Sequence, residues 1–80
     1  MSKADKMFEE LGYNKEYGRI EFFNDDYISF EYKDDYDYNY ILFSLKDKTI
    51  KTQCYHELSV KEHLAIHEKM KELGWLNEKI

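Results

Sequence analysis

The sequence predicts an α+β fold of two layers, in which an antiparallel β-meander of three to four strands is flanked by an N-terminal and a C-terminal helix. Three observations support this α-β-β-β-β-α order. Apolar residues recur at helical spacing near both ends, they alternate with a period of two in the middle, and short polar segments separate the alternating runs. Such short connections join antiparallel neighbours. The 80 residues make a single small domain, residues 1–80.

The first element is a short helix. Ser2 is a favourable N-cap residue, and Asp5 follows three positions later in a relaxed form of the capping box. The apolar stripe of this helix consists of Ala4, Met7, Phe8 and Leu11. Gly12 is typical of a helix C-terminus, and Tyr13 occupies the position where a Schellman motif packs an apolar residue against Phe8.

The last element is a second helix with the same type of ends. Ser59 and Glu62 form a complete capping box. Gly74 ends the helix, and we expect Trp75 to fold back on Met70. The two helix ends share this chemistry, but nothing else in the two halves of the chain aligns.

Four runs rich in Ile, Phe, Tyr and Thr lie between the helices and are predicted to be strands. They cover residues 19–23, 27–33, 38–45 and 49–55, with polar turns at 24–26, 34–35 and 46–48. In the third run, Ile41 and Phe43 share one face, and Tyr38 and Tyr40 share the other. We expect the helices to cover the aliphatic face and to leave the tyrosines on the uncovered one.

The negative charge is concentrated in one segment. Residues 24–40 hold six acidic residues and one lysine, so this segment carries the whole net charge of −5, together with five of the eight tyrosines. Tyrosine offers a large contact area at low entropic cost and is enriched at binding hot spots. Carboxylates around it would steer a basic partner toward the surface.

We therefore expect a non-enzymatic protein-binding module that engages a basic surface of another protein. The residues predicted to make this contact are Asp25, Asp26, Tyr27, Asp34, Asp35, Tyr36, Asp37, Tyr38 and Tyr40. One alternative is a solvated sheet face whose aspartates only keep the turns soluble. Another is a homodimer or larger homo-oligomer in which this face pairs with itself.

The histidines and the cysteine suggest a second class of function. Projected at about 100° per residue, the last helix places His63 and His67 in its apolar half. The other members of that half are Val60, Leu64, Ile66, Met70 and Leu73. Cys54 and His56 are two positions apart in a predicted strand and so point the same way.

These four residues, Cys54, His56, His63 and His67, are candidate zinc ligands of a metal-stabilised structural or regulatory domain. Structural zinc sites usually carry more thiolates than one. The competing interpretation is therefore that no cofactor is bound. In that case the imidazoles pack on the apolar seam and hydrogen-bond a tyrosine hydroxyl or a carbonyl, and Cys54 is a small core residue.

Several classes are not expected. The acidic balance disfavours direct binding to nucleic acid or to anionic membranes. No run approaches the roughly 20 apolar residues of a membrane span, and residues 1–6 do not resemble a signal peptide. The single cysteine cannot form an internal disulfide. We therefore expect a cytoplasmic protein. A phosphate-binding glycine loop, a complete calcium loop and an assignable acid/base pair are all missing, so we expect no enzyme.

Two segments carry a resemblance to known proteins. They consist of Ala4, Met7, Phe8, Glu9, Glu10, Leu11, Gly12 and Tyr13, and of Glu72, Leu73, Gly74, Trp75 and Leu76. In these segments the chain resembles short uncharacterised proteins encoded by phages and prophages of low-GC Gram-positive bacteria. The resemblance implies an accessory protein that binds a host protein, such as an inhibitor of a nucleic-acid-handling or defence factor.

Overall fold

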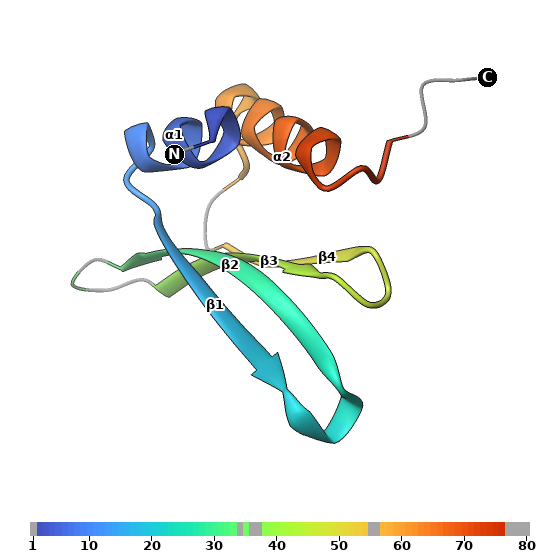
Figure 1. Ribbon diagram of the computed structural model, residues 1–80. Helices are drawn as coiled ribbons and strands as arrows, with labels where there is room; N and C mark the ends of the chain where they lie inside the picture. The colour runs from blue at the N-terminus through green and yellow to red at the C-terminus, as the bar shows by residue number, and fades with distance from the viewer. Residues whose placement is uncertain (1, 34, 36–37, 55–56, 77–80) are drawn as a thin grey trace.

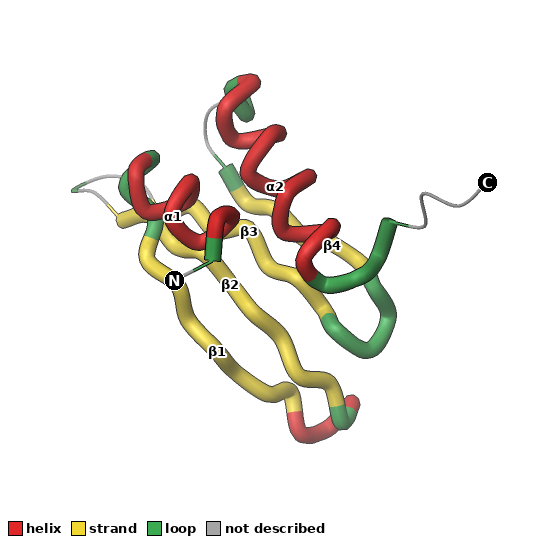
Figure 2. Tube along the Cα trace, turned by 45° about the horizontal axis from the view of Figure 1, so that its top comes forward, coloured by secondary structure: helices red, strands yellow, loops and turns green. Residues whose placement is uncertain are grey.

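A computed structural model of the chain describes residues 2–33, 35, 38–54 and 57–76. The elements in chain order are α1 (Lys3–Glu10), β1 (Asn14–Ile20), the short 3-10 helix η1 (Glu21–Phe23), β2 (Asp25–Lys33), β3 (Tyr38–Ser44), β4 (Thr49–Gln53) and α2 (Val60–Glu72). The strands form one antiparallel sheet in the order β1-β2-β3-β4. Both helices lie on the same side of this sheet (Figures 1 and 2). The predicted α-β-β-β-β-α fold in two layers is confirmed.

The ends of both helices follow the predicted capping chemistry. The Ser2 hydroxyl accepts the backbone N–H of Asp5 at 3.0 Å, and a full capping box links Ser59 with Glu62. At the other ends, Gly12 and Gly74 adopt φ values of 92° and 74°, a left-handed conformation that glycine tolerates without strain. The backbone N–H of the residue after each glycine donates to a carbonyl oxygen in the last helical turn, from Tyr13 to Phe8 and from Trp75 to Met70. These hydrogen bonds confirm both Schellman motifs.

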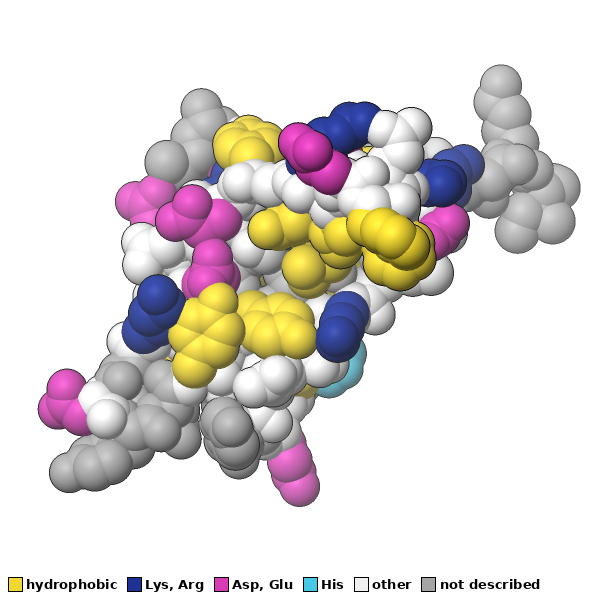
Figure 3. Space-filling model, turned by 90° about the horizontal axis from the view of Figure 1, so that it is seen from below, with side chains coloured by type: hydrophobic (Ala, Val, Ile, Leu, Met, Phe, Trp, Pro, Cys, Tyr) yellow, Lys and Arg dark blue, Asp and Glu magenta, His cyan; other side chains and the backbone are white. Residues whose placement is uncertain are grey.

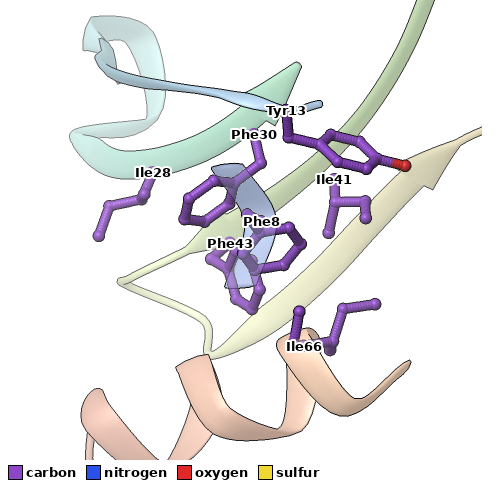
Figure 4. Close-up of a cluster of buried hydrophobic side chains, with 8 residues drawn as sticks. Phe8, Tyr13, Ile28, Phe30, Ile41, Phe43 and Ile66 are labelled. Carbon is purple, nitrogen blue, oxygen red and sulfur yellow. The ribbon is translucent and has the colours of Figure 1, made fainter. Parts of the chain in front are cut away.

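The core lies between the helices and the middle of the sheet. Phe8 of α1 is fully buried and stacks on Phe30 of β2, with ring centroids 3.9 Å apart. Phe43 of β3 meets both rings edge-on (Figure 4). Ile41 of β3 is opposite Phe30 in the sheet, so the apolar residues of the two central strands share the covered face. This arrangement confirms that the odd-numbered aliphatic and aromatic residues of β3 face the helices.

The first strand differs from the prediction. It covers Asn14–Ile20 instead of residues 19–23, and residues 21–23 form η1. The chain reverses at Asn24, whose φ of 52° is a left-handed conformation that asparagine adopts more readily than most residues. Asp25 and Asp26 were expected in the turn, but they pair with β1 as the first residues of β2. The other strands agree with their predicted ranges to within two residues.

The second helix is rotated relative to the prediction. Its buried residues are Glu62, Ala65, Ile66 and Lys69. Val60 and Leu64 were expected to face the sheet, but their side chains are 74% and 53% exposed. The difference corresponds to roughly a third of a turn. The expectation was wrong because placing the apolar residues toward the sheet puts Glu62 and Lys69 on the solvent side, whereas the structure buries both.

A polar cluster between the helices explains this rotation. Lys69 is only 5% exposed, and its Nζ lies 3.0 Å from Oδ1 of Asp5. The other carboxylate oxygen of Asp5 lies 2.7 Å from Nζ of Lys15. Nearby, the hydroxyl of Tyr13 donates to Oε2 of the buried Glu62 at 2.5 Å. Because each buried charge has a partner of complementary chemistry, α2 can turn these two residues inward.

Candidate interaction surface

The face of the sheet opposite the helices carries Tyr27 of β2 and Tyr38 and Tyr40 of β3, whereas Tyr32 of β2 packs against the core. Tyr38 is 39% exposed and Tyr40 is half-buried, whereas Ile41 and Phe43, which alternate with them, are fully buried beneath the helices. The predicted division of β3 between its two faces is therefore confirmed. Viewed from this side, hydrophobic side chains form a group in the middle of the surface, with acidic and basic side chains around it (Figure 3).

We call this group the tyrosine face and define it as Tyr27, Tyr38, Tyr40 and Leu42. The strand register places its members together, since Tyr27 pairs with Ser44 two positions beyond Leu42. The rings of Tyr38 and Tyr40 are adjacent, with centroids 5.9 Å apart. Four large side chains on rigid central strands make a surface that needs little ordering when a partner binds.

Charged neighbours hold the ring of Tyr38 in place. Its hydroxyl donates to a carboxylate oxygen of Glu31, and this hydrogen bond raises the pKa of Tyr38 to about 12. Nζ of Lys33 lies 5.2 Å from the centre of the ring, within the range of a cation–π contact. The tyrosine is therefore neutral at physiological pH and is oriented by one contact at its tip and another on its side.

Tyr27 has a structural partner as well as an exposed side. Its side chain covers Gly18 of β1 so closely that an added Cβ would overlap the phenol ring and its hydroxyl. Gly18 and Tyr27 are paired across the two strands. An aromatic ring that covers a glycine in a neighbouring strand restores packing that the glycine lacks. Gly18 therefore allows Tyr27 to lie flat across the sheet.

Asp25 is placed inside the fold. It is buried, and its carboxylate accepts the hydroxyl of Ser44 at 2.6 Å and the backbone N–H of Lys46 at 3.2 Å. These bonds tie the start of β2 to the end of β3 and the turn that follows. Because this carboxylate is buried and hydrogen-bonded, its role is structural, and the proposed contact surface does not include Asp25.

The remaining acidic residues of the predicted contact lie elsewhere. Asp26 is exposed and forms an ion pair of 2.9 Å with Arg19 of β1. Asp35 is exposed in the connection between β2 and β3. Three further predicted contact residues, Asp34, Tyr36 and Asp37, lie outside the described residues.

The exposed tip of the β1–β2 hairpin was not predicted from the sequence. Phe22 and Phe23 of η1 are 91% and 61% exposed, and their rings are in edge-to-face contact with centroids 5.0 Å apart. A signal was present in the sequence. Two consecutive phenylalanines in a strand would point to opposite faces, so at least one would have lacked cover from the helices.

The candidate zinc ligands are distributed as follows. Cys54 is half-buried after β4, and His56 lies outside the described residues. His63 and His67 are exposed on α2, so they do not pack into an apolar seam. Nδ1 of His63 donates to the Ser59 carbonyl oxygen at 2.9 Å, one turn earlier in the chain. Among the residues that the structure describes, no three His, Cys, Asp or Glu side chains lie close enough together to hold a metal ion.

A further set of groups with shifted pKa values lies between the helices and the sheet. Burial and the Glu62 carboxylate raise the pKa of Tyr13, and burial together with Glu62 also raises the pKa of the Cys54 thiol. Both shifts favour the neutral, protonated form. A phenol and a thiol that are protonated at neutral pH are weak nucleophiles. We therefore assign Tyr13 and Glu62 to the packing of α2 on the sheet.

Comparisons with known proteins identify no family for the chain. No family model, no curated protein and no solved structure matches the chain. Within the described part of the chain, neither helix has the length and apolar character needed to cross a membrane.

Proposed function

We propose that this protein is a non-enzymatic binding module that engages a basic surface of a host protein through the tyrosine face and the acidic connection beside it. The observation that carries the proposal is the position of Tyr38 and Tyr40. They lie on rigid central strands, on the side that the helices leave uncovered. Large aromatic side chains of this kind are the usual anchors of protein–protein contacts.

Charge supports a basic partner. The segment 24–40 carries the net charge of the chain, and two of its acidic groups, Asp25 and Glu31, are already hydrogen-bonded within the fold. Asp26 is paired with Arg19, and the remaining acidic residues, Asp34, Asp35 and Asp37, come shortly before Tyr38 in the sequence. A negative edge beside an aromatic surface would accelerate association with a positive partner and repel acidic proteins.

The resemblance to phage and prophage proteins supplies the biological setting of the proposal. An accessory protein of this origin acts in the cytoplasm of a low-GC Gram-positive host. Its partner would be a host protein with an exposed basic surface, such as a nucleic-acid-handling or defence factor. Blocking that surface would be its effect, with no chemical step.

Affinity capture with matched variants tests this proposal. The immobilised protein is exposed to a lysate of a low-GC Gram-positive bacterium, and bound proteins are identified by mass spectrometry. Tyr38→Thr with Tyr40→Thr removes the aromatic surface but keeps residues that favour strands. Tyr17→Thr is the control, because Tyr17 is 71% exposed but shares the helix side of the sheet with Ile28.

We expect the double variant to lose a basic partner that the wild type and the Tyr17 variant retain. Replacing Asp34, Asp35 and Asp37 by lysine is expected to abolish the same capture, as is salt at about 0.5 M. Circular dichroism verifies that each variant is folded. Equal capture by the wild type and both tyrosine-face and charge variants would contradict the proposal.

A further inference from the structure

The outer edge of β1 is open. The sheet order makes β1 and β4 the edge strands, and among the described residues β1 pairs with β2 alone. The tube view shows β1 along the outside of the sheet (Figure 2). Alternate backbone N–H and C=O groups of an edge strand point away from the sheet, where a further strand would continue the ladder. The chemistry of this edge therefore specifies an extended strand as its partner.

β1 lacks most of the features that protect an edge strand from pairing. Such strands are commonly very short, interrupted by a bulge or a proline, or rich in unpaired charge. β1 pairs with β2 over all seven of its residues without a break, and it contains no proline. Carboxylates of the same chain hold both of its basic side chains, since Lys15 binds Asp5 and Arg19 binds Asp26.

The two edges of the sheet differ in their exposed apolar side chains. β4 has five residues, and none of them is a large exposed hydrophobic residue. β1 carries two such residues, Tyr17 and Ile20, which point to opposite faces of the sheet because they are three positions apart. The hairpin that holds them bends away from the helix layer (Figure 1). A strand added beside β1 would therefore cover apolar surface on both faces.

A second copy of β1 fits this edge in one register. Two antiparallel copies are related by a twofold axis, and residues of equal parity pair, because alternate residues direct their backbone groups outward. One residue therefore lies on the axis, and three choices pair more than half of the strand. Glu16 on the axis is opposite itself, and Tyr17 on the axis places Lys15 opposite Arg19. Only Gly18 on the axis leaves no like charges opposite each other.

We propose that β1 of one copy pairs antiparallel with β1 of a second copy, with Gly18 on the twofold axis. In this register Glu16 is opposite Ile20, and Tyr17 is opposite Arg19, whose guanidinium forms favourable contacts with aromatic rings. The antiparallel arrangement places the helices of the two copies at opposite ends of the paired strands. Because the axis is perpendicular to the sheet, the two four-stranded sheets join into one with both tyrosine faces on the same side.

A charge exchange at one cross-strand pair tests this register. Ile20→Glu places a carboxylate opposite Glu16 of the second copy, and adding Glu16→Lys restores opposite charges at that pair. Glu16→Lys alone is the matched control, since it leaves a lysine opposite Ile20. Both side chains are exposed, so the three variants are expected to fold, which circular dichroism verifies. Sedimentation equilibrium measures the association constant of each protein.

The wild-type mass is expected to rise from 9.8 kDa toward twice that value as the concentration increases from about 10 μM to about 1 mM. Ile20→Glu is expected to lower the association constant at least about tenfold, because the symmetric contact contains the repelling pair twice. The double variant and Glu16→Lys are expected to associate within about threefold of the wild type. Recovery in the double variant does not come from the fold of the hairpin, since the substitution at position 20 is retained.

Disulfide trapping locates the contact directly. In a Cys54→Ser background, an equimolar mixture of Glu16→Cys and Ile20→Cys is expected to form a mixed disulfide on mild oxidation, because the two positions are opposite each other. Each variant alone is expected to form none, since equal positions in the two copies are about 13 Å apart along the strands.

Several outcomes would overturn the inference. A wild type that stays monomeric throughout the concentration range would do so, as would a double variant that associates no better than Ile20→Glu. Association that persists in Ile20→Glu but disappears in Tyr38→Thr with Tyr40→Thr would assign the contact to the tyrosine face instead. Capture of a host protein by the tyrosine face is measured separately, so either proposal can fail while the other stands.

Discussion

The two helices start and stop by the same chemistry but bury different side chains. Each begins at a serine N-cap and ends in a Schellman motif at a glycine. In α1 the buried residues are Ala4 and Phe8, as an amphipathic pattern predicts. In α2 the buried set includes Glu62 and Lys69, while Val60 and Leu64 are exposed. Helix ends are thus determined locally, whereas the rotation of a helix about its axis depends on the partners that the rest of the fold provides.

The partners of α2 come from α1 and the residues just after it. Asp5 binds Lys69, Tyr13 binds Glu62, and Glu72 accepts the backbone N–H of Ala4 at 2.9 Å. A carboxylate at the N-terminus of α1 also interacts favourably with the helix dipole. The first helix is therefore anchored by its own apolar residues, whereas the second combines the buried Ala65 and Ile66 with polar contacts to α1 and Tyr13.

The largest expected effect is on the apolar anchor of α1. Phe8→Ala removes a fully buried ring from a three-ring cluster and should lower the free energy of unfolding by about 3–5 kcal/mol. Ile66→Ala in α2 should cost less, because Ile66 is smaller and lies at the edge of the core. Urea denaturation measures both, with Phe8→Leu as a milder variant if Phe8→Ala does not fold. A larger loss for Ile66→Ala would contradict the comparison.

The next effect concerns the polar anchor of α2. Among the described residues, Asp5→Ala leaves the buried Lys69 ammonium with Glu72, at 3.6 Å, as its carboxylate partner, and should cost about 3 kcal/mol. Adding Lys69→Met removes the unpaired charge and should restore most of the loss. If the double variant is no more stable than Asp5→Ala, the ion pair does not orient α2.

The same anchor predicts a pH dependence. Burial would raise the pKa of Asp5, but hydrogen bonds from Lys15 and Lys69 outweigh it and hold the pKa below the ordinary value of 3.8. The unfolded chain therefore binds protons before the folded one as the pH falls, so this contribution to stability is complete above the ordinary pKa and is lost below it. Wild-type stability should decline below about pH 4, and Asp5→Ala should show a shallower decline.

A smaller difference in stability is expected between alanine variants of the two N-cap serines. Ser59→Ala removes one bond of a complete capping box and should cost about 1–2 kcal/mol, whereas Ser2→Ala, at the first turn of the chain, should cost about 0.5 kcal/mol. Thermal denaturation followed by circular dichroism compares them. Equal losses would indicate that the capping box gives α2 no advantage over α1.

The smallest expected effect lies on the exposed side of α2. Leu64→Lys should change the free energy of unfolding by no more than about 0.5 kcal/mol, because the side chain is largely in solvent. Ile66→Lys, two positions away, is the matched control and should unfold the protein or cost several-fold more. A substantial loss for Leu64→Lys would show that α2 faces the sheet as its apolar pattern alone suggests.

Much of the fold could be predicted because it depends on neighbours in the sequence. The capping serines, the glycines after each helix and the alternation of Ile41 and Phe43 with Tyr38 and Tyr40 are short-range patterns. The start of β1 could not be predicted in this way. Residues 14–18 lack a run of apolar side chains, and they form a strand because each of them pairs with a residue of β2.

The same distinction between short-range sequence patterns and tertiary contacts applies to the candidate surface. The sequence by itself determined which residues of β3 share a face, since side chains in a strand alternate with a period of two. Only the tertiary structure decided that the buried Asp25 accepts a hydrogen bond from Ser44. It also decided that Phe22 and Phe23 are exposed at the hairpin tip and that Val60 and Leu64 face outward. The physical reason is that burying a charged group depends on a partner, and Asp5 and Tyr13 are separated from Lys69 and Glu62 by most of the chain.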